Sequence, residues 1–305
     1  MKPRPFVAGL AICTLLLAPS CKKDDSKQAG NPSGDSGVTK ILRFSAIPDE
    51  NTTEQSAKFK KFSAYLSSKL GVKAEFVPAT DYGASVDKFV NGEIHLAWFG
   101  GLTGVQARAE VEGARAIAQG IEDTDYISYF IANTTTGLEL SEDFPAAIKD
   151  MKFTFGSKNS TSGRLMPSFF IKEATGTKAT KWFSKPVGVS GAHDKTAKLV
   201  EAGTFQIGAL SYKKYDSMVE NGDLDVKKCR VIWKTPSYAD YNWTAHPDLE
   251  NIFGSGFIDK LQEALVAIDD PALLKALTRT GIIPADNDDF QIIADVARQL
   301  GLLND

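Results

Sequence analysis

The 305-residue sequence is poor in side chains that bind soft metals. It has three cysteines and three histidines, and their positions show no CxxC, HExxH or HxH spacing. The cysteines are Cys13, Cys21 and Cys229, and the histidines are His95, His193 and His246. The sequence therefore predicts no zinc or haem site, and we expect the protein to carry no metal and no other cofactor.

The sequence also lacks a surplus of positive charge. It has 35 Lys and Arg against 38 Asp and Glu, a net charge of −3. Without excess cations the chain cannot neutralise a phosphate backbone by releasing counterions, which argues against a nucleic-acid partner. The 43% of hydrophobic and 24% of charged residues are typical of a folded protein. At this length two lobes of about 100–200 residues are expected.

A single short apolar run opens the chain. It covers residues 6–18 and follows Lys2 and Arg4. The run is too short to span about 30 Å of hydrocarbon, but it is typical of the core of a signal peptide. We predict a lipoprotein signal peptide over residues 1–20; a buried N-terminal helix is the alternative.

The segment after this run resembles a bacterial lipoprotein cleavage box. The residues Leu17-Ala-Pro-Ser-Cys21 end in the cysteine that would receive the lipid, although Ala18 stands where Leu is usual. Lipidated Cys21 and a flexible tether of Gly, Ser and Asp would occupy residues 21–38. Cleavage would remove two positive charges, leaving −5, and acylation of Cys21 would leave Cys229 without a disulfide partner. The expected location is the periplasm or the cell surface, with a lipid anchor in a membrane.

Strand and helix patterns alternate from Lys40 onward. Strands are expected at 41–47, 74–77 and 94–99, with helices after Asn51 and over 82–90. This order predicts an α/β protein with a parallel, doubly wound sheet.

The pattern restarts near Tyr126 and forms a second α/β unit. We expect lobe 1 to combine 39–130 with 235–305 and lobe 2 to span 131–234, so that two crossing strands join the lobes. Ligands of such folds bind in the cleft beyond the carboxyl ends of the strands.

Residues 153–167 contain the most informative polar segment. A short strand ends at Gly156, and Ser160, Thr161 and Ser162 then open a helix. The free N–H groups of the first turn, the helix dipole and three hydroxyls together would form a cradle for an oxyanion. The segment is not a P-loop, because GxxxxGK[ST] is absent. An ordinary Ser/Thr N-cap is the alternative.

Six segments resemble, in order, the signatures of one protein family. They are AIPDENTTE (46–54), DYGASV (81–86), AWFGGLTGVQA (97–107), STSGRLMP (160–167), SGAHD (190–194) and YADYNW (238–243). Together they resemble the substrate-binding proteins of phosphate, phosphite and phosphonate ABC transporters, nearest the selenate-binding branch. The resemblance implies a two-lobed type II periplasmic-binding fold, a small tetrahedral oxyanion ligand and delivery to a permease, and it implies no enzyme activity. We expect a monomer.

The resemblance also implies roles for particular residues. Ser160, Thr161 and Ser162 would grip the oxyanion from one lobe, and Tyr82 would donate its hydroxyl from the other. His193 matches a family histidine near the ligand, although it could instead cap a helix or lie at a hinge.

Other candidates come from the ends of strands. Trp98 and Phe99 would form a wall of the cleft or belong to the core, and Tyr241 is a further candidate ligand contact. Asp49 would accept a proton from a protonated ligand, or serve only as a turn residue. Such a carboxylate would favour monoprotonated phosphate or phosphonate and repel fully ionised selenate or sulfate. Ser211 replaces the acidic residue of aminophosphonate-binding relatives, which argues against that ligand class.

Two other functions compete with oxyanion binding. The first is the binding of a quaternary-ammonium-type cation by an aromatic cluster with a carboxylate as counter-charge. Its residues would be Trp98, Tyr238, Tyr241, Trp243 and Asp240. The second is a serine hydrolase that uses Ser190 beside His193, although GVSGA lacks the spacing of a GxSxG elbow.

Overall fold

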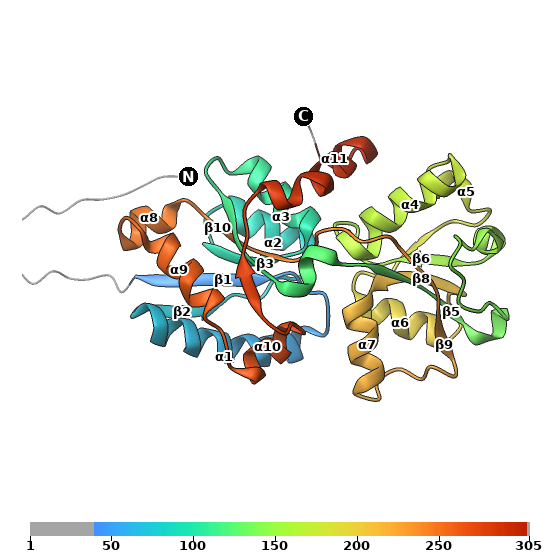
Figure 1. The fold of residues 1–305 in the computed structure, drawn as a ribbon, viewed down its shortest axis with the longest axis horizontal. Coiled ribbons are helices and arrows are strands. Elements are labelled where there is room, and N and C mark those ends of the chain that lie inside the picture. Colours follow the sequence, from blue (N-terminus) through green and yellow to red (C-terminus); the bar gives the residue numbers. More distant parts are fainter. Residues whose placement is uncertain (1–39, 304–305) are drawn as a thin grey trace, which may run out of the picture. The chain divides into compact units, whose positions relative to one another are not determined.

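The computed structural model describes residues 40–303, which lie in one compact unit. The predicted signal peptide, Cys21 and the tether fall outside the described residues. The first of two sheets has six strands in the order β11-β4-β10-β3-β1-β2 (Figure 1). Their bounds are β1 (Ile41–Ala46), β2 (Lys73–Phe76), β3 (Leu96–Phe99), β4 (Arg115–Gly120), β10 (Asn242–Ala245) and β11 (Ile282–Pro284).

The second sheet has five strands in the order β7-β6-β8-β5-β9. Its strands are β5 (Ser128–Asn133), β6 (Phe153–Phe155), β7 (Gly188–Val189), β8 (Ile207–Ser211) and β9 (Cys229–Lys234). The α/β fold is therefore two-lobed, with a sheet in each lobe. The chain crosses between the sheets at 121–127 and at 235–241, and the two crossings pair through the bridge between Tyr126 and Tyr238.

Both sheets are mixed, whereas the sequence pattern predicts parallel strands. In the first sheet, β1 pairs in parallel with β2 and β3, as the βα order predicts. Strand β10, however, lies antiparallel between β3 and β4. It arrives directly from the second crossing, without the crossover helix that a parallel neighbour requires. The return of the chain between lobes therefore inserts the antiparallel strand.

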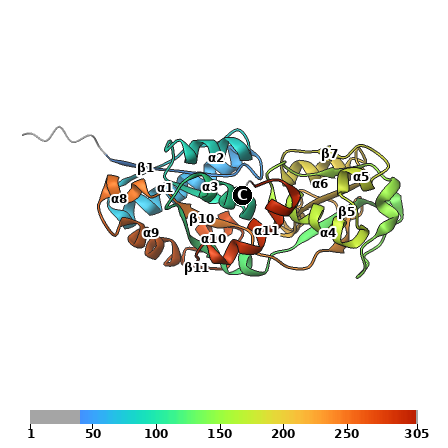
Figure 2. The same cartoon turned by 90° about the horizontal axis from the view of Figure 1, so that it is seen from above.

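Helices cover both sheets. Asn51 caps the first of them by accepting from the N–H groups of Thr53 and Glu54, and Gly71 ends it in the left-handed conformation. The last helix, α11, contacts α3 of the first lobe and α4 of the second, as the view from above shows (Figure 2). The helices of the first lobe are α1 (Thr52–Leu70), α2 (Tyr82–Val90), α3 (Gly101–Glu110), α8 (Asp248–Phe253), α9 (Phe257–Val266), α10 (Pro271–Leu277) and α11 (Gln291–Leu300). Those of the second are α4 (Met166–Thr175), α5 (Ala179–Trp182), α6 (His193–Glu201) and α7 (Tyr212–Glu220).

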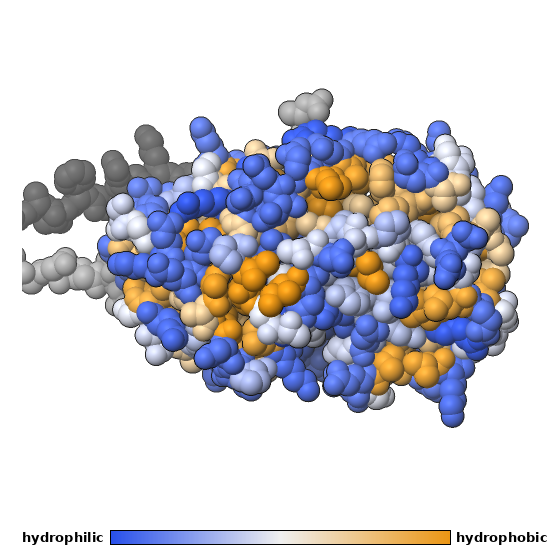
Figure 3. Space-filling view, in the orientation of Figure 1, coloured by the Kyte–Doolittle hydropathy of each residue, from blue (hydrophilic) through white to orange (hydrophobic). Residues whose placement is uncertain are grey.

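Each lobe has its own apolar core. Trp243 and Phe44 lie in the core of the first lobe, and Phe130 and Phe155 lie in that of the second. Cys229 is fully buried at the start of β9, and burial raises the pKa of its thiol to about 12. None of the described helices is both long and apolar enough to cross a membrane. The face in Figure 3 is largely hydrophilic, with separate apolar patches.

Candidate functional site

The helix predicted at Ser160 begins with one π-type turn, Thr161–Leu165, which continues into α4. Ser160 Oγ caps this turn by accepting the N–H of Gly163 at 2.9 Å. Thr161 Oγ1 accepts the N–H of Leu102 at 3.0 Å, from the first turn of α3 in the other lobe. Because each hydroxyl oxygen already accepts an N–H, its own hydrogen can donate to a neighbouring carboxyl group or to a ligand. Ser160 is thus an N-cap, as the alternative predicts, and remains able to bind an anion.

His193 lies against this turn. A Cβ added to Gly163 would lie 2.9 Å from Ser160 Oγ and 3.1 Å from His193 Cε1, so only glycine leaves room for the imidazole. His193 Nδ1 accepts the backbone N–H of Ser211 at 3.3 Å, which places the ring proton on Nε2. Burial, and then the positive charge of Lys214, lower the pKa of His193 to about 3. The histidine is therefore an uncharged donor at neutral pH.

Two buried polar atoms near the cradle have no hydrogen-bond partner within residues 40–303. Tyr82, the first residue of α2, is 1% exposed, and its hydroxyl is unpaired. Asp240 is also 1% exposed; its Oδ1 accepts the N–H of Gly101 at 2.9 Å, and its Oδ2 is unpaired. Buried polar groups almost always have partners. A donor and an acceptor left unpaired beside the same turn therefore make this region the candidate site.

Asp240 and Thr161 meet at the start of α3. A Cβ added to Gly100 would lie 3.1 Å from Thr161 Oγ1 and 3.3 Å from Asp240 Oδ1. Burial raises the pKa of Asp240 to about 7, although the N–H of Gly101 and the hydroxyls of Thr161 and Ser162 act to lower it. The carboxyl group thus exchanges its proton near neutral pH.

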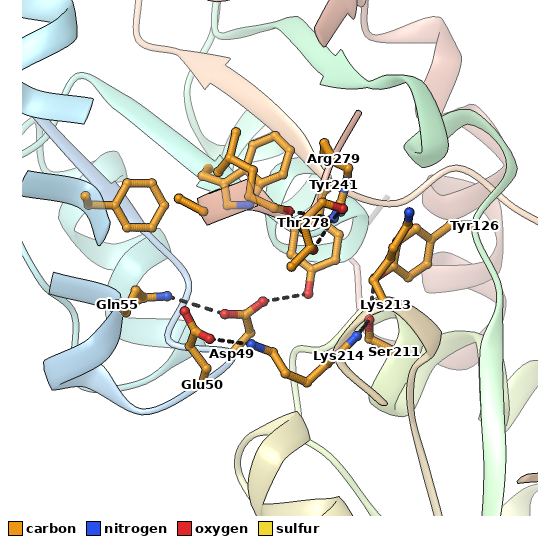
Figure 4. Close-up of a pocket in the computed structure, with 14 residues that line it drawn as sticks. Asp49, Glu50, Gln55, Tyr126, Ser211, Lys213, Lys214, Tyr241, Thr278 and Arg279 are labelled. Carbon is orange, nitrogen blue, oxygen red and sulfur yellow. Dashed lines mark hydrogen bonds and ion pairs between the residues drawn. The ribbon is translucent and has the colours of Figure 1, made fainter. Parts of the chain in front are cut away.

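Asp49 and Tyr241 form a second polar group beside the first. Asp49 Oδ2 accepts the Tyr241 hydroxyl at 2.9 Å, and Asp49 Oδ1 accepts Gln55 Nε2 at 3.4 Å (Figure 4). Burial raises the pKa of Asp49, while the charge of Lys214 lowers it. Both residues line a cavity of about 30 Å³, together with Ser211 and Lys214. A cavity of this size holds about one or two water molecules.

Trp98 and Phe99 point in opposite directions, because neighbouring residues of a strand face opposite sides of the sheet. Trp98 stacks on Tyr241 with 5.5 Å between ring centroids and lines the cavity. Phe99 is fully buried and packs on Phe89 at 5.6 Å. The structure therefore brings Trp98 to the cavity and places Phe99 in the core.

The aromatic cluster considered for a cationic ligand already holds a cation of the chain. The Cζ of Arg279 lies 4.9 Å from the ring centroid of Tyr241, 5.4 Å from that of Tyr126 and 5.5 Å from that of Trp98. Its guanidinium also makes two bonds, of 2.6 and 2.7 Å, to the buried carboxylate of Asp123. The cation–π contacts that would recruit a ligand are thus made internally.

The remaining aromatic candidates of that cluster are also engaged. Tyr238 OH lies 2.5 Å from Ser128 Oγ, which in turn donates to the carbonyl of Ser162 at 2.7 Å. Trp243 is fully buried against Phe44, 6.3 Å between ring centroids. Neither residue faces a vacant site for a cation.

The arrangement required for a serine hydrolase is not formed. Ser190 Oγ contacts Thr196 Oγ1 at 2.6 Å and the carbonyl of Ala192 at 3.1 Å. His193 directs Nδ1 to Ser211 instead, so the serine and the histidine are not paired. Over residues 40–303 no group of three or more His, Cys, Asp or Glu side chains could hold a metal ion.

Comparison with known proteins identifies the family. Residues 44–290 match the model for the periplasmic substrate-binding protein of phosphonate ABC transporters. A probable phosphite-binding protein of an ABC transporter, PhnD1 from Prochlorococcus marinus strain MIT 9301, is 35% identical over 86% of this chain and 90% of its own. The chain belongs to this family of phosphonate ABC-transporter substrate-binding proteins.

Two further relatives support the assignment. The solved structure of PhnD1 from Prochlorococcus marinus, in complex with methylphosphonate, matches with a TM-score of 0.82 and covers 87% of this chain and all of the other. A phosphate-import protein, PhnD from Mycolicibacterium smegmatis, is 29% identical over 84% of this chain and 79% of its own. Members of the phosphonate-binding family are extracytoplasmic components of transporters and not enzymes.

Sequence reasoning missed part of this site. It offered Asp240 only as the counter-charge of a cation, and it did not include Arg279, Glu50 or Lys214. The signal for Asp240 was present, because it lies in the family-like segment YADYNW. Arg279 gave no signal, since its partner Asp123 is 156 residues away in the chain.

Proposed function

We propose that the protein binds a small, monoprotonated tetrahedral oxyanion, namely phosphite, phosphate or a small phosphonate, and delivers it to an ABC permease. The observation that supports this proposal most directly is that two buried atoms beside the hydroxyl-rich turn at Ser160, Tyr82 OH and Asp240 Oδ2, have no hydrogen-bond partner among the described residues. The turn and Tyr82 would donate to the anion's oxygens, as would His193 Nε2. Relatives named for phosphite and phosphate, and one bound to methylphosphonate, support this ligand class.

Asp240, rather than Asp49, would accept the ligand's proton. Both oxygens of Asp49 already accept hydrogen bonds, from Tyr241 and Gln55. In the described part of the chain, Asp240 Oδ2 has no hydrogen-bond partner. A carboxylate in that position would bond to a P–OH group but repel fully ionised selenate or sulfate. We therefore place selenate and sulfate outside the ligand class.

The strength of such a site is adequate for uptake. About five hydrogen bonds to a charged ligand, each of about 1.5–3 kcal/mol, give roughly 7–15 kcal/mol before the costs of association. The upper part of this range leaves the roughly 8 kcal/mol that a micromolar dissociation constant requires.

Calorimetry with a panel of anions tests the proposal. Protein without residues 1–20 and with Cys21→Ser would be titrated with phosphate, phosphite, methylphosphonate, selenate, selenite and sulfate. We expect Thr161→Ala to lower the affinity for the anion about ten- to a hundred-fold, because one charge-assisted hydrogen bond is lost. Thr175→Ala removes a hydroxyl that bonds only within and just beyond α4, and should leave affinity unchanged. Unaltered affinity in Thr161→Ala would remove the cradle from the proposal.

Selectivity tests the role of Asp240. An amide can donate to an aprotic anion, so Asp240→Asn should reduce the preference for phosphite over sulfate at least about tenfold. Asp49→Asn serves as the matched control and should alter that ratio much less. If Asp49→Asn reduces the preference for phosphite over sulfate more than Asp240→Asn does, Asp49 is the acceptor instead.

We further propose that the mature protein is a monomer anchored through lipidated Cys21. Lobe 1 would comprise 39–130 and 235–305, and lobe 2 would comprise 131–234; the span of the second sheet, Ser128–Lys234, supports this division. Mass spectrometry of the membrane fraction should find acyl chains on Cys21, and Cys21→Ser should release the protein. If the wild-type protein and the Cys21→Ser variant both stay with the membrane, or if both are released from it, the proposed anchor is wrong.

A further inference from the structure

We propose that Glu50 and Lys214 set the affinity of the site by latching the two lobes together over the bound anion, without touching it. The inference rests on the proposed function and concerns residues outside the cradle. Glu50 lies between β1 and α1 in the first lobe, and Lys214 lies in α7 of the second. Their side chains form an ion pair across the lobes, as Figure 4 shows.

The pair is enclosed rather than exposed. The side chain of Lys214 is 12% exposed and that of Glu50 is 10% exposed. Lys58 of α1 makes a second ion pair with Glu50 at 2.7 Å, which holds the carboxylate in place from its own lobe. A partly buried pair with fixed geometry is worth more than a pair in water, and the loss of one partner leaves the other charge uncompensated.

Burial of Lys214 depends on the approach of the other lobe. Burial acts to lower the pKa of Lys214, yet the carboxylates of Asp49 and Glu50 hold it above the ordinary value. Both carboxylates belong to the first lobe, so separating the lobes would remove them from the ammonium. The same ammonium would then regain water. The ion pair therefore belongs to the closed arrangement and favours it.

The ammonium of Lys214 is also engaged by carboxylates and does not contact the anion directly. Its ammonium is bonded to Glu50, and Asp49 stands beside it in the wall of the cavity. A lysine between two carboxylates presents little net positive charge to a ligand. Direct contact and latching consequently make opposite predictions for the removal of Glu50.

The experiment compares binding kinetics in charge-neutral variants of the full mature chain with Cys21→Ser. Phosphite, phosphate and methylphosphonate would be the probes. Glu50→Gln and Lys214→Gln should each weaken binding about ten- to a hundred-fold, mainly through faster dissociation. The double variant should bind the anion no more weakly than either single variant, because each single substitution already removes the ion pair. Lys214→Arg should retain most of the affinity.

A matched control comes from a pair within one lobe. Lys198 and Glu201 form an ion pair at 2.9 Å along α6, and Lys198→Gln should keep affinity within about twofold. Ionic strength gives a second readout. Salt screens the two charges once the lobes separate, so raising it to about 0.5 M should accelerate dissociation from the wild-type protein more than from Glu50→Gln.

The outcomes separate the latch from the proposed function. If Glu50→Gln binds as tightly as wild type, the latch is wrong. If it binds more tightly, Lys214 contacts the anion directly and the latch is also wrong. If the two single effects add in the double variant, the pair is not coupled and the latch is again wrong, while oxyanion binding stands. If the wild-type protein binds none of the three anions, the proposed function and the latch both fail.

Discussion

His193 shows how burial sets the charge of a side chain in the candidate site. A cationic imidazole would attract an anion more strongly, but burial holds the pKa of this ring at about 3. Its Nδ1 is occupied by Ser211, so Nε2 carries the single proton. The site therefore obtains a donor of fixed direction whose charge does not vary with pH in the physiological range.

We predict that His193 stays neutral between pH 5 and 8. Its folded pKa lies below the ordinary 6.5, so the unfolded chain binds the proton first. The stability owed to neutral His193 is present above pH 6.5 and is lost as pH falls towards 3, by up to about 1.4 kcal/mol per pH unit. NMR of the ring Cε1–H, assigned with His193→Asn, should show a flat shift over pH 5–8. A titration with a midpoint near 6.5 would contradict this.

At the scale of single residues, the sequence predicts roles that depend on neighbouring residues better than roles that depend on contacts between distant residues. Ser160, Thr161 and Ser162 stand together in the sequence, and a hydroxyl run at a helix start has a physical meaning without any partner. Asp240 acquires its role only where it meets Gly101, 139 residues earlier in the chain. No local pattern reports such a meeting.

At the scale of elements, the π-type turn over Thr161–Leu165 depends on the glycine inside it. We predict that Gly163→Ala abolishes measurable anion binding in calorimetry. Its Cβ would lie 3.2 Å from Gly156 Cα as well as close to Ser160 and His193, and backbone atoms cannot yield as a flexible side chain can. The turn would shift away from the ligand.

The control for this prediction is Ser168→Ala, on the half-buried side of the same helix. It adds no atom and should leave both affinity and melting temperature close to wild type. Full binding by Gly163→Ala would show that the turn can relax without losing the site.

The elements themselves were largely predictable, and their pairing was less so. The start of a helix after Asn51 was predicted from residue type and spacing, and the structure confirms it. The antiparallel entry of β10 between β3 and β4 was not predicted. It follows from where the chain returns after the second lobe, and the βα pattern of one lobe does not contain that information.

At the scale of the whole molecule, the buried pair Asp123–Arg279 fastens the region where the chain crosses between the sheets. Asp123 belongs to the first crossing, and its carbonyl accepts the N–H of Asp240 from the second at 3.0 Å. The side chains of the pair are 0% and 2% exposed. Both crossings are thereby tied to one ionic centre.

We predict that Asp123→Ala lowers the free energy of unfolding by about 3–5 kcal/mol, because Arg279 would remain buried without its counter-charge. Urea denaturation measures this change. Arg298→Ala removes an exposed ion pair with Asp295 and should cost less than about 1 kcal/mol. Equal effects of the two substitutions would mean that the junction contributes no special stability.

The inert state of Cys229 has a practical consequence. It is the sole cysteine among residues 40–303, and its buried thiol, with a pKa near 12, will not react with maleimides at neutral pH. A cysteine introduced at Val189, which is 44% exposed on the edge strand β7, would then be the labelled position in Cys21→Ser protein. The molecule is suited to carry a fluorophore, and so to serve as an optical sensor for the anion that it captures.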